Sequence, residues 1–247
     1  TIATTGNAQD FGDLYQTRGS ASSCSSATRG LWGGGYKNGP ATRYNIIDYV
    51  TISSTGNSFD YGDLLYDPTY AATCSSSTRG IWAGGQNPTV FKTINYVTIA
   101  TLGNAADFGE LTSARKEFAG CSSPTRGVFS AGRDVDNNRI NLIDYLTIAT
   151  TGNTLDFGDL TQNTDSSASF SSSTRGIIAG GNDGVGPRSN VISYITIASL
   201  GDAIDFGDLT AARANYTGCS NSIRGIAAGG FTPLSPTTVV DTMDYVT

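Results

Sequence analysis

The residues of this chain that could do chemistry come in sets of five. One set is the Arg of a Thr-Arg-Gly motif and its close variant, at Arg29, Arg79, Arg126, Arg175 and Arg224. A second is the first Asp of an Asp-Phe-Gly-Asp-Leu motif with small variations, at Asp10, Asp60, Asp107, Asp156 and Asp205. A ring of such groups could bind an anion or a cation. The alternative, which we favour, is structural: an Asp that accepts backbone N–H bonds or pairs with an Arg fixes a turn in every repeat.

Other catalytic chemistry is poorly represented. The chain has no His, which excludes Ser-His and Cys-His dyads and every His-ligated metal site. A catalytic group should be singular, and no acid stands out against the fivefold background. No Gly-rich phosphate-binding motif is present, and a net charge of -6 argues against a nucleic-acid partner. We therefore expect no enzyme activity, no catalytic residue and no cofactor.

The cysteines and one acidic loop give no metal site. Cys24, Cys74, Cys121 and Cys219 hold the same place in four repeats, too far apart for disulfides, so we expect buried free thiols. Asp134, Asp136 and Asn138 resemble the opening of a calcium loop. However, Arg139 stands where such a loop needs Gly, and Tyr145 stands where it needs Glu, so we expect no metal.

Distances between the motifs show where the repeat is rigid. A third marker, the Tyr of an Asp-Tyr-Val-Thr-Ile-like motif, occurs at Tyr49, Tyr96, Tyr145, Tyr194 and Tyr245. From each Tyr to the next Arg there are always 30 residues, and from each Arg to the last Gly of its run always 6. From that Gly to the following Tyr the distance varies between 11 and 15 residues. All length variation therefore lies in one loop of the repeat.

Composition and periodicity predict an all-β fold. With 31 Gly and only 15% charged residues, the chain lacks the bias of helical proteins. Each unit reads as four short antiparallel strands whose apolar residues point to both faces, as in a sheet that is buried on both sides. Five such units predict a five-bladed β-propeller; a β-helix or solenoid is the alternative. The N-terminal strand would complete the C-terminal blade and close the ring. The whole chain, 1-247, would be one propeller, with blades at about 15-64, 65-111, 112-160, 161-209, and 210-247 plus 1-14.

The repeat resembles a known family. Gly-Gly, a variable loop, Tyr, an aromatic residue with Leu, Ala-Arg, and an apolar strand leading back to Gly-Gly resemble the kelch repeat. The full repeat sequence, close to IDYVTIATTGNAxDFGDLT and CSSxTRGxxAGG, is similar to kelch-like repeats of bacteriophage virion and tail-fibre-type proteins. The chain departs from other kelch proteins by carrying Phe or Tyr where those have Trp, at Phe11, Tyr61, Phe108, Phe157 and Phe206. The resemblance implies the propeller fold and association with a virion, while kelch propellers serve many roles.

One face of the disc is expected to vary. In an up-and-down blade, the loops between strands two and three emerge on the same face as the segments between strand four and the next blade, and these are the parts that differ among repeats. Loops on a rigid scaffold are where proteins place recognition. Our candidate ligand-binding residues are Tyr36, Arg43, Tyr44, Phe91, Lys92, Arg133, Arg139, Tyr15, Tyr66 and Tyr70, and the same face would also carry Lys37, Arg188, Phe231, Arg18, Arg115 and Arg213. The alternative is that the sequences of these loops vary because no function constrains them.

Three functions remain open. The variable face could recognise a host-surface glycan or protein, as a non-enzymatic adhesin-type module of a phage virion component. The chain could be a purely architectural virion domain that binds another virion protein. A carbohydrate-active enzyme is the least favoured. No apolar run is long enough for a membrane span, so we expect a soluble, monomeric domain without nucleic-acid or membrane partners.

Overall fold

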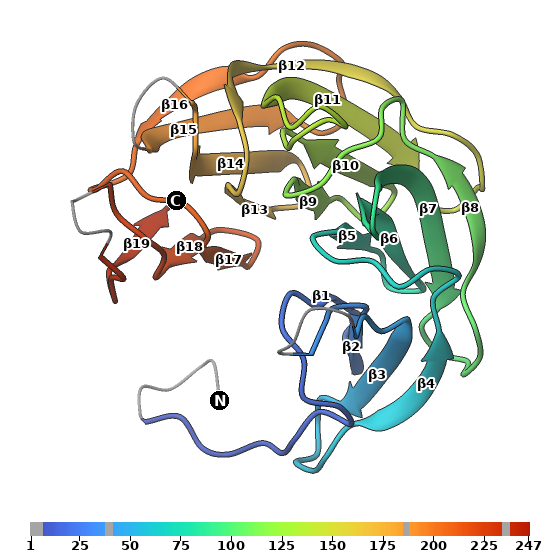
Figure 1. Cartoon of the computed structure of the whole chain (residues 1–247). Helices are drawn as coiled ribbons and strands as arrows, with labels where there is room; N and C mark the ends of the chain where they lie inside the picture. The colour runs from blue at the N-terminus through green and yellow to red at the C-terminus, as the bar shows by residue number, and fades with distance from the viewer. Residues whose placement is uncertain (1–6, 38–41, 185–187, 234–237) are drawn as a thin grey trace.

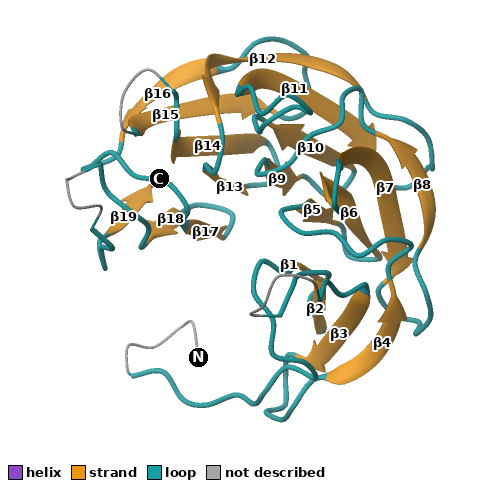
Figure 2. Ribbon diagram, viewed as in Figure 1, coloured by secondary structure: helices purple, strands orange, loops and turns teal. Residues whose placement is uncertain are grey.

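The computed structural model describes residues 7–37, 42–184, 188–233 and 238–247. This part of the chain contains strands and no helix, and thus no helix long and apolar enough to cross a membrane. The strands form separate antiparallel sheets arranged around a centre (Figures 1 and 2). The first two sheets consist of β1 (Ser22–Ser25), β2 (Arg29–Gly33), β3 (Ile46–Thr51) and β4 (Phe59–Asp63), and of β5 (Ala72–Ser75), β6 (Arg79–Gln86), β7 (Val90–Thr98) and β8 (Ala106–Glu110).

The remaining sheets repeat this order. The third and fourth consist of β9 (Ala119–Ser122), β10 (Arg126–Ser130), β11 (Ile140–Thr147) and β12 (Leu155–Thr164), and of β13 (Ala168–Ser171), β14 (Arg175–Gly181), β15 (Ser189–Thr196) and β16 (Ile204–Asp208). The fifth has β17 (Thr217–Ser220), β18 (Gly225–Ala228) and β19 (Met243–Val246). Within each blade, strands that follow in sequence pair with each other, and the first strand faces the centre (Figure 1). The predicted all-β, five-bladed propeller is confirmed, and the solenoid alternative is wrong.

The predicted fourth strand of the fifth blade is not formed in the described residues. The fifth sheet has three strands, and residues 7–14 belong to no strand. They lie instead beside the first blade, where the backbone N–H groups of Gly56 and Ser58 donate to the carbonyls of Phe11 and Asp13 at 2.7 and 2.8 Å. These are the bonds that an outer strand makes with the next blade: Gly103 and Ala105 bond in the same way to Tyr61 and Asp63. Residues 1–6 lie outside the described residues.

The middle strands are buried on both faces, as their apolar sequence predicts. In β6, the six consecutive residues from Gly80 to Gly85 are all buried. One hydrophobic cluster joins Ile81 and Ile94 of the second blade to Phe129 and Leu146 of the third. Most of the core therefore lies between neighbouring blades, and a single blade could not bury its own apolar side chains.

Neighbouring blades approach so closely that a Gly is required at the contact. A Cβ atom added at Gly80, which follows the Arg of β6, would lie 2.6 Å from Sγ of Cys24 in the first blade. The same Cβ position at Gly127 is 2.5 Å from Sγ of Cys74. Real Cβ atoms do not approach this closely, so the Gly of the Thr-Arg-Gly motif is needed for packing.

A second Gly sits where the outer strand meets the next blade. Gly109 has a φ of +143°, and a Cβ there would lie 2.4 Å from the backbone oxygen of Gly152 in the third blade. Gly207 holds the same place in the fourth blade with a φ of +138°, but nothing lies within 4 Å of its Cβ position. The two glycines thus share their backbone conformation and differ in their contact with a neighbouring blade.

This difference allows a matched test of the packing between blades. Gly207→Ala should cost only the backbone strain, about 1–2 kcal/mol of the free energy of unfolding. Gly109→Ala should cost about 2 kcal/mol more, because the methyl group also pushes the blades apart. Urea unfolding of both variants measures the difference. Equal losses would mean that the contact with Gly152 contributes nothing to stability.

The four cysteines are free thiols, as predicted, but they are not equally buried. Cys74 and Cys121 are buried, Cys24 is partly exposed, and Cys219 in the last blade is exposed. Burial raises the pKa of Cys121 to about 12 and that of Cys74 well above its usual value. Cys219 lies on β17, and in the described part of the chain no further blade packs beyond the fifth (Figure 1).

Thiol labelling should therefore separate these residues. At pH 8, a maleimide should modify Cys219 within minutes, while Cys74 and Cys121 should react only as fast as the protein unfolds, because their thiolates are not populated. Peptide mapping by mass spectrometry identifies the labelled sites. Rapid labelling of Cys74 in the folded protein would contradict the packing of the second and third blades.

Candidate functional site: the variable face

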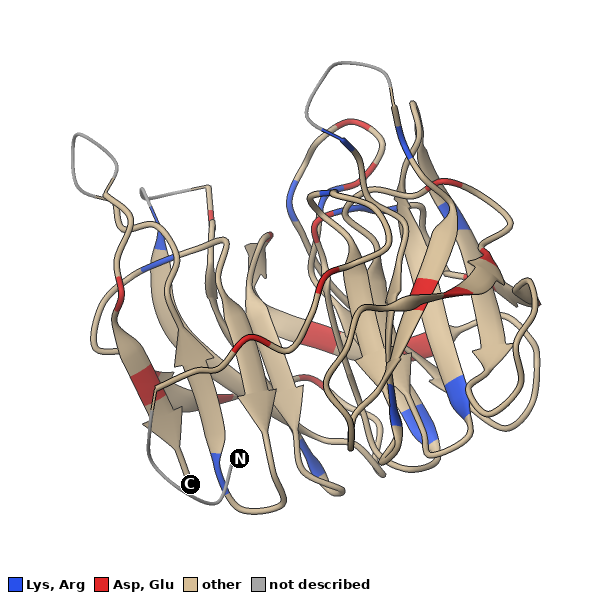
Figure 3. Ribbon diagram, turned by 90° about the horizontal axis from the view of Figure 1, so that it is seen from below, with Lys and Arg blue, Asp and Glu red and all other residues tan. Residues whose placement is uncertain are grey.

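The loops between strands two and three lie beside the segments that enter each blade, as predicted. Tyr36 forms isolated β-bridges with Gly19 and Arg43, and Arg133 does so with Lys116 and Arg139. We call this side of the disc the variable face. In the edge-on ribbon of Figure 3, charged residues occur at both ends of the blades. Charge alone therefore does not distinguish the variable face, and the contacts that fix its side chains are described below.

Five residues with positive φ line the entry to the inner strands. They hold the same position in each repeat and have φ between 54° and 60°: Ser20, Tyr70, Glu117, Ser166 and Asn215. Backbone bonds join them from blade to blade, with the N–H of Glu117 donating to the carbonyl of Tyr70 and the N–H of Ser166 to the carbonyl of Glu117, at 3.1 and 2.9 Å. This conformation is strained for side chains such as Tyr and Glu. The scaffold thus fixes five backbone sites, which carry four different types of side chain.

Sequence reasoning identified only Tyr70 of these five residues. Their signal was positional: each lies seven residues after the second acidic residue of the Asp-Phe-Gly-Asp motif. Residue type gave no guidance, because Asn is the only one of these residue types that often adopts the left-handed backbone conformation.

An aromatic group lies across the first and second blades. The rings of Tyr66 and Phe91 are 5.8 Å apart, and Tyr66 and Tyr70 are 49% and 39% exposed. Burial, and then the neighbouring Tyr36 hydroxyl, raise the pKa of Tyr70, which keeps it protonated. Arg43 donates to Oδ1 of Asn87 in the second blade at 2.7 Å. Five of the ten predicted ligand-binding residues are therefore gathered on these two blades.

A second group is an ion cluster across the third and fourth blades. Nε of Arg133 lies 2.9 Å from Oδ2 of Asp165 and 3.1 Å from Glu117, and Nε of Arg139 lies 2.6 Å from the same Asp165 oxygen. Asp165 is buried, and its Oδ1 accepts bonds from Ser166 and Asn182. Both Arg side chains remain partly exposed. The cluster holds two guanidinium groups in fixed positions at the surface.

The remaining predicted residues lie outside both groups. Lys92 pairs with Glu110 at 2.8 Å on the outer part of the second blade. Tyr44 is partly buried and follows the loop of the first blade. Tyr15 is exposed in the N-terminal segment, where its N–H donates to Oγ of Ser58. They are therefore separate from the aromatic group and the ion cluster.

Three Arg residues that we expected on the variable face are buried. Arg18, Arg115 and Arg213 each pair with an Asp of the third strand of their own blade: Asp48 at 2.9 Å, and Asp144 and Asp244 at 2.8 Å. Burial lowers the pKa of Arg115 to about 10, although Asp144 opposes this shift. These residues are available to no ligand; they tie the entering segment to the third strand.

The buried pair of the first blade is less well satisfied than the others. In the third blade, the hydroxyl of Thr112 donates to Oδ1 of Asp144 at 2.6 Å, and Thr210 does the same for Asp244. Tyr15 occupies this position in the first blade, and Oδ1 of Asp48 has no hydrogen-bond partner among the described residues. Burial raises the pKa of Asp48, with Arg18 opposing the shift.

Replacing Tyr15 by Thr should supply the missing hydroxyl and raise the free energy of unfolding by about 1 kcal/mol at pH 7. A carboxyl whose pKa is higher in the folded protein loses stability as the pH rises through that pKa. The Thr hydroxyl would donate to the charged carboxylate of Asp48 and stabilise that form. The gain in the free energy of unfolding should therefore be larger at pH 7 than at pH 3, where Asp48 is protonated in the folded and in the unfolded protein. Thermal unfolding at the two pH values, with Tyr15→Ala as control, measures it. A gain shared by Tyr15→Ala would contradict the hydroxyl as its cause.

The repeated Arg and Asp residues make internal contacts. Each Arg stacks on the Tyr of its own blade at 4.5–4.8 Å from the ring centre, and Arg29, Arg79 and Arg126 also donate to a carbonyl of the next blade. Asp10, Asp60 and Asp205 accept the N–H of the Gly two residues later. Among the described residues, no ion pair joins the two sets, so the expected Arg–Asp pairing is not observed.

Two of the hollows in the structure lie beside repeated residues of the blades. The central one, about 540 Å³, is lined by the inner strands, whose hydroxyls already donate to carbonyls of the preceding blade, as Thr73 does to Ser23 at 2.6 Å. No Asp, Glu, Lys or Arg of the described residues lines it. Its polar wall therefore contributes to the contact between blades.

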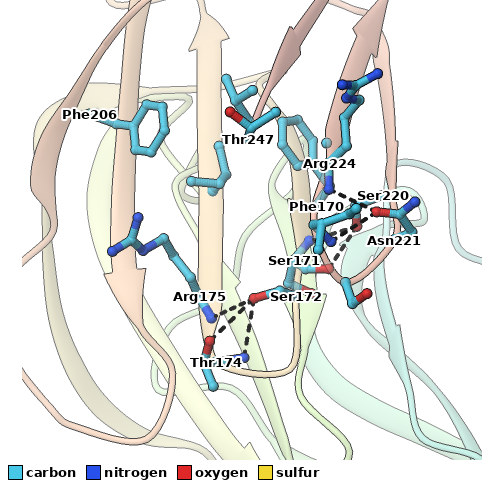
Figure 4. A pocket seen from close by; sticks show the side chains of 15 residues that line it. Phe170, Ser171, Ser172, Thr174, Arg175, Phe206, Ser220, Asn221, Arg224 and Thr247 are labelled. Atoms are coloured by element: carbon cyan, nitrogen blue, oxygen red, sulfur yellow. Dashed lines mark hydrogen bonds between the residues drawn. The ribbon is translucent and has the colours of Figure 1, made fainter.

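The other hollow, about 390 Å³, lies between the fourth and fifth blades (Figure 4). Ser172 accepts the N–H groups of Thr174 and Arg175, and Asn221 accepts that of Arg224. In the first three blades, the equivalent of Arg175 bonds to the turn after the third strand of the next blade. This hollow therefore lies where, between the earlier blades, an Arg side chain bonds to the neighbouring turn.

The calcium-like loop is held by its own backbone. Oδ1 of Asp134 accepts the N–H groups of Asp136 and Asn138 at 2.9 and 2.8 Å, and its Oδ2 accepts the Asn138 amide. The carboxylate of Asp134 thus closes the turn.

Comparison with known proteins adds no further assignment: no protein family and no curated protein matches the chain. The function must therefore be argued from the geometry of the variable face.

Proposed function

We propose that the chain is a non-enzymatic binding module whose variable face contacts a protein or glycan partner. The observation that supports this proposal is the contrast between the two faces. The turns opposite the variable face repeat one arrangement, in which Ser26, Ser76, Ser123 and Ser172 accept the N–H of the Arg three residues later. On the variable face, equivalent backbone sites carry different side chains.

The chemistry of this face suits recognition. The bridge position after the Gly-Gly pair is filled by Tyr36, Gln86, Arg133, Asn182 and Phe231. Rigid aromatic residues and Arg contribute most to binding energy at protein interfaces, and aromatic rings also stack on sugars. Because Tyr66 and Phe91 contact each other and Asp165 holds both Arg side chains, little side-chain entropy is lost on binding.

The resemblance to phage kelch-like repeats makes the proposal more specific. On that basis the module belongs to a virion component, and its partner is a glycan or protein of the host surface. A purely architectural role, with another virion protein as partner, is the second candidate. The same resemblance supports both, and they differ only in the partner.

A binding screen with matched variants tests the variable face. The first variant, Tyr66→Ser with Tyr70→Asn, removes two exposed rings, and Asn tolerates the left-handed backbone at position 70. The control, Leu102→Ser with Leu200→Ser, removes two exposed apolar side chains from the opposite face. Against host-envelope fractions and purified polysaccharides, the first variant should bind at least about tenfold more weakly, and the control should bind like the unchanged protein.

The outcomes separate the candidates. Binding to a virion protein and to no host fraction would favour the architectural role. Equal binding by both variants would place the contact elsewhere and contradict the proposal for the variable face. Loss of polysaccharide viscosity on incubation would support an enzyme instead.

A further inference from the structure

The outer edge of β19 is open. In the first four blades, the third strand pairs with a fourth on its outer side, whereas in the described residues β19 pairs only with β18. The side chains of Met243 and Tyr245 on this strand are 72% and 66% exposed. An open strand edge with exposed apolar side chains is a template for a further strand.

The strand that fits this edge is present in the chain. Residues 10–14 read Asp-Phe-Gly-Asp-Leu, a sequence that lies in the fourth strand of another repeat, β12. One edge of this segment already contacts the first blade through the carbonyls of Phe11 and Asp13. Its other edge, which would pair with a third strand, has no strand partner among the described residues.

A missing aromatic pair marks the same two segments. Four blades place the Tyr of the third strand edge-to-face against an aromatic residue of the fourth, with centroids 5.7–6.1 Å apart: Tyr49–Tyr61, Tyr96–Phe108, Tyr145–Phe157 and Tyr194–Phe206. The fifth pair would be Tyr245 with Phe11. Both are exposed instead, although a pair of this kind stabilises a contact beyond its buried area.

The two segments lie apart within one molecule. The first and fifth blades stand at opposite ends of an open arc, and the described N-terminal segment runs from the first blade into the open side of this arc (Figure 1). The curvature of the arc is set by contacts such as those of Gly80 with Cys24 and Gly127 with Cys74, which leave no space for closer approach. Closing the arc within one molecule would require neighbouring blades to pack differently at such contacts.

We propose that residues 9–14 of one copy add to β19 of a second copy. The register follows from the first blade, where Ile46 pairs with Asp63 and Ile47 with Gly62. It places Thr242 opposite Asp13 and Met243 opposite Gly12 of the other copy. If both copies exchange this segment, the contact closes as a two-fold dimer, and exchange of an identical element costs little. The proposal replaces the monomer expected from sequence and does not depend on the ligand of the variable face.

Cysteine cross-linking between two differently labelled chains tests the pairing. One chain carries Asp13→Cys and the other Thr242→Cys, both with Cys219→Ser to remove the exposed native thiol. Mild oxidation of an equal mixture should give a disulfide-linked species of twice the chain mass, because directly opposed residues can meet disulfide geometry. Each chain alone, and each mixed with a Leu102→Cys chain, should give little.

Two results would overturn the proposal. A chain carrying both substitutions could cross-link internally while the mixture stays monomeric, which would show closure within one molecule. No cross-link in either sample would show that β19 remains open.

Light scattering of the unchanged protein provides a second measurement. It should give a mass of about twice the monomer, falling on dilution. Phe11→Ala should raise the dissociation constant about tenfold or more by removing the ring that faces Tyr245, and Leu102→Ala should leave it unchanged. A monomer at every concentration, or equal dissociation constants for the two variants, would contradict the exchange.

Discussion

The close contact between a Gly of one blade and the inner strand of the preceding blade is the constraint on which the structure depends. Sulfur atoms fill the space beside Gly80, Gly127 and Gly176, and Phe170 fills it beside Gly225. Because these glycines have no Cβ, the sheets approach closely enough for inner-strand hydroxyls to reach the carbonyls of the preceding blade. The same spacing lets Arg29 reach the next blade. One small residue per repeat thus sets the distance between blades.

A fixed spacing also explains how one face can vary without loss of the fold. Tyr70 and Glu117 occupy equivalent left-handed sites, and the N–H of Glu117 bonds to the carbonyl of Tyr70 through the backbone alone. Because these bonds join backbone groups, the side chains at these sites can change while the bonds persist. The turns on the opposite face have no such freedom, because there a side chain makes the bond: Oγ of Ser76 accepts the N–H of Arg79. The residues of the proposed binding face are therefore largely separate from those that pack the blades together.

Much of this architecture could be predicted from sequence, because the fixed distances between Arg, Gly and Tyr place the strands of the first four blades and the three strands of the fifth. The buried Arg residues could not be assigned from residue type, since a charged side chain in a connecting segment is normally exposed. A signal existed in the repeats. Arg115 occurs with Asp144, whereas the blade with Asn95 in the place of that Asp has Pro68 in the place of the Arg. Reading the two positions together would have indicated a buried pair.

The partner of β19 shows where sequence reasoning ends. The pattern Asp-Phe-Gly-Asp-Leu specifies a fourth strand, and the unpaired rings of Phe11 and Tyr245 are complementary. Strand pairing depends on this local pattern. Whether two ends of one chain can meet depends instead on the curvature of the arc, which is the sum of four contacts between blades. Since Gly80 and Gly127 fix how closely neighbouring blades approach, the packing between blades bears on whether the same strand pairs within one molecule or, as we propose, between two.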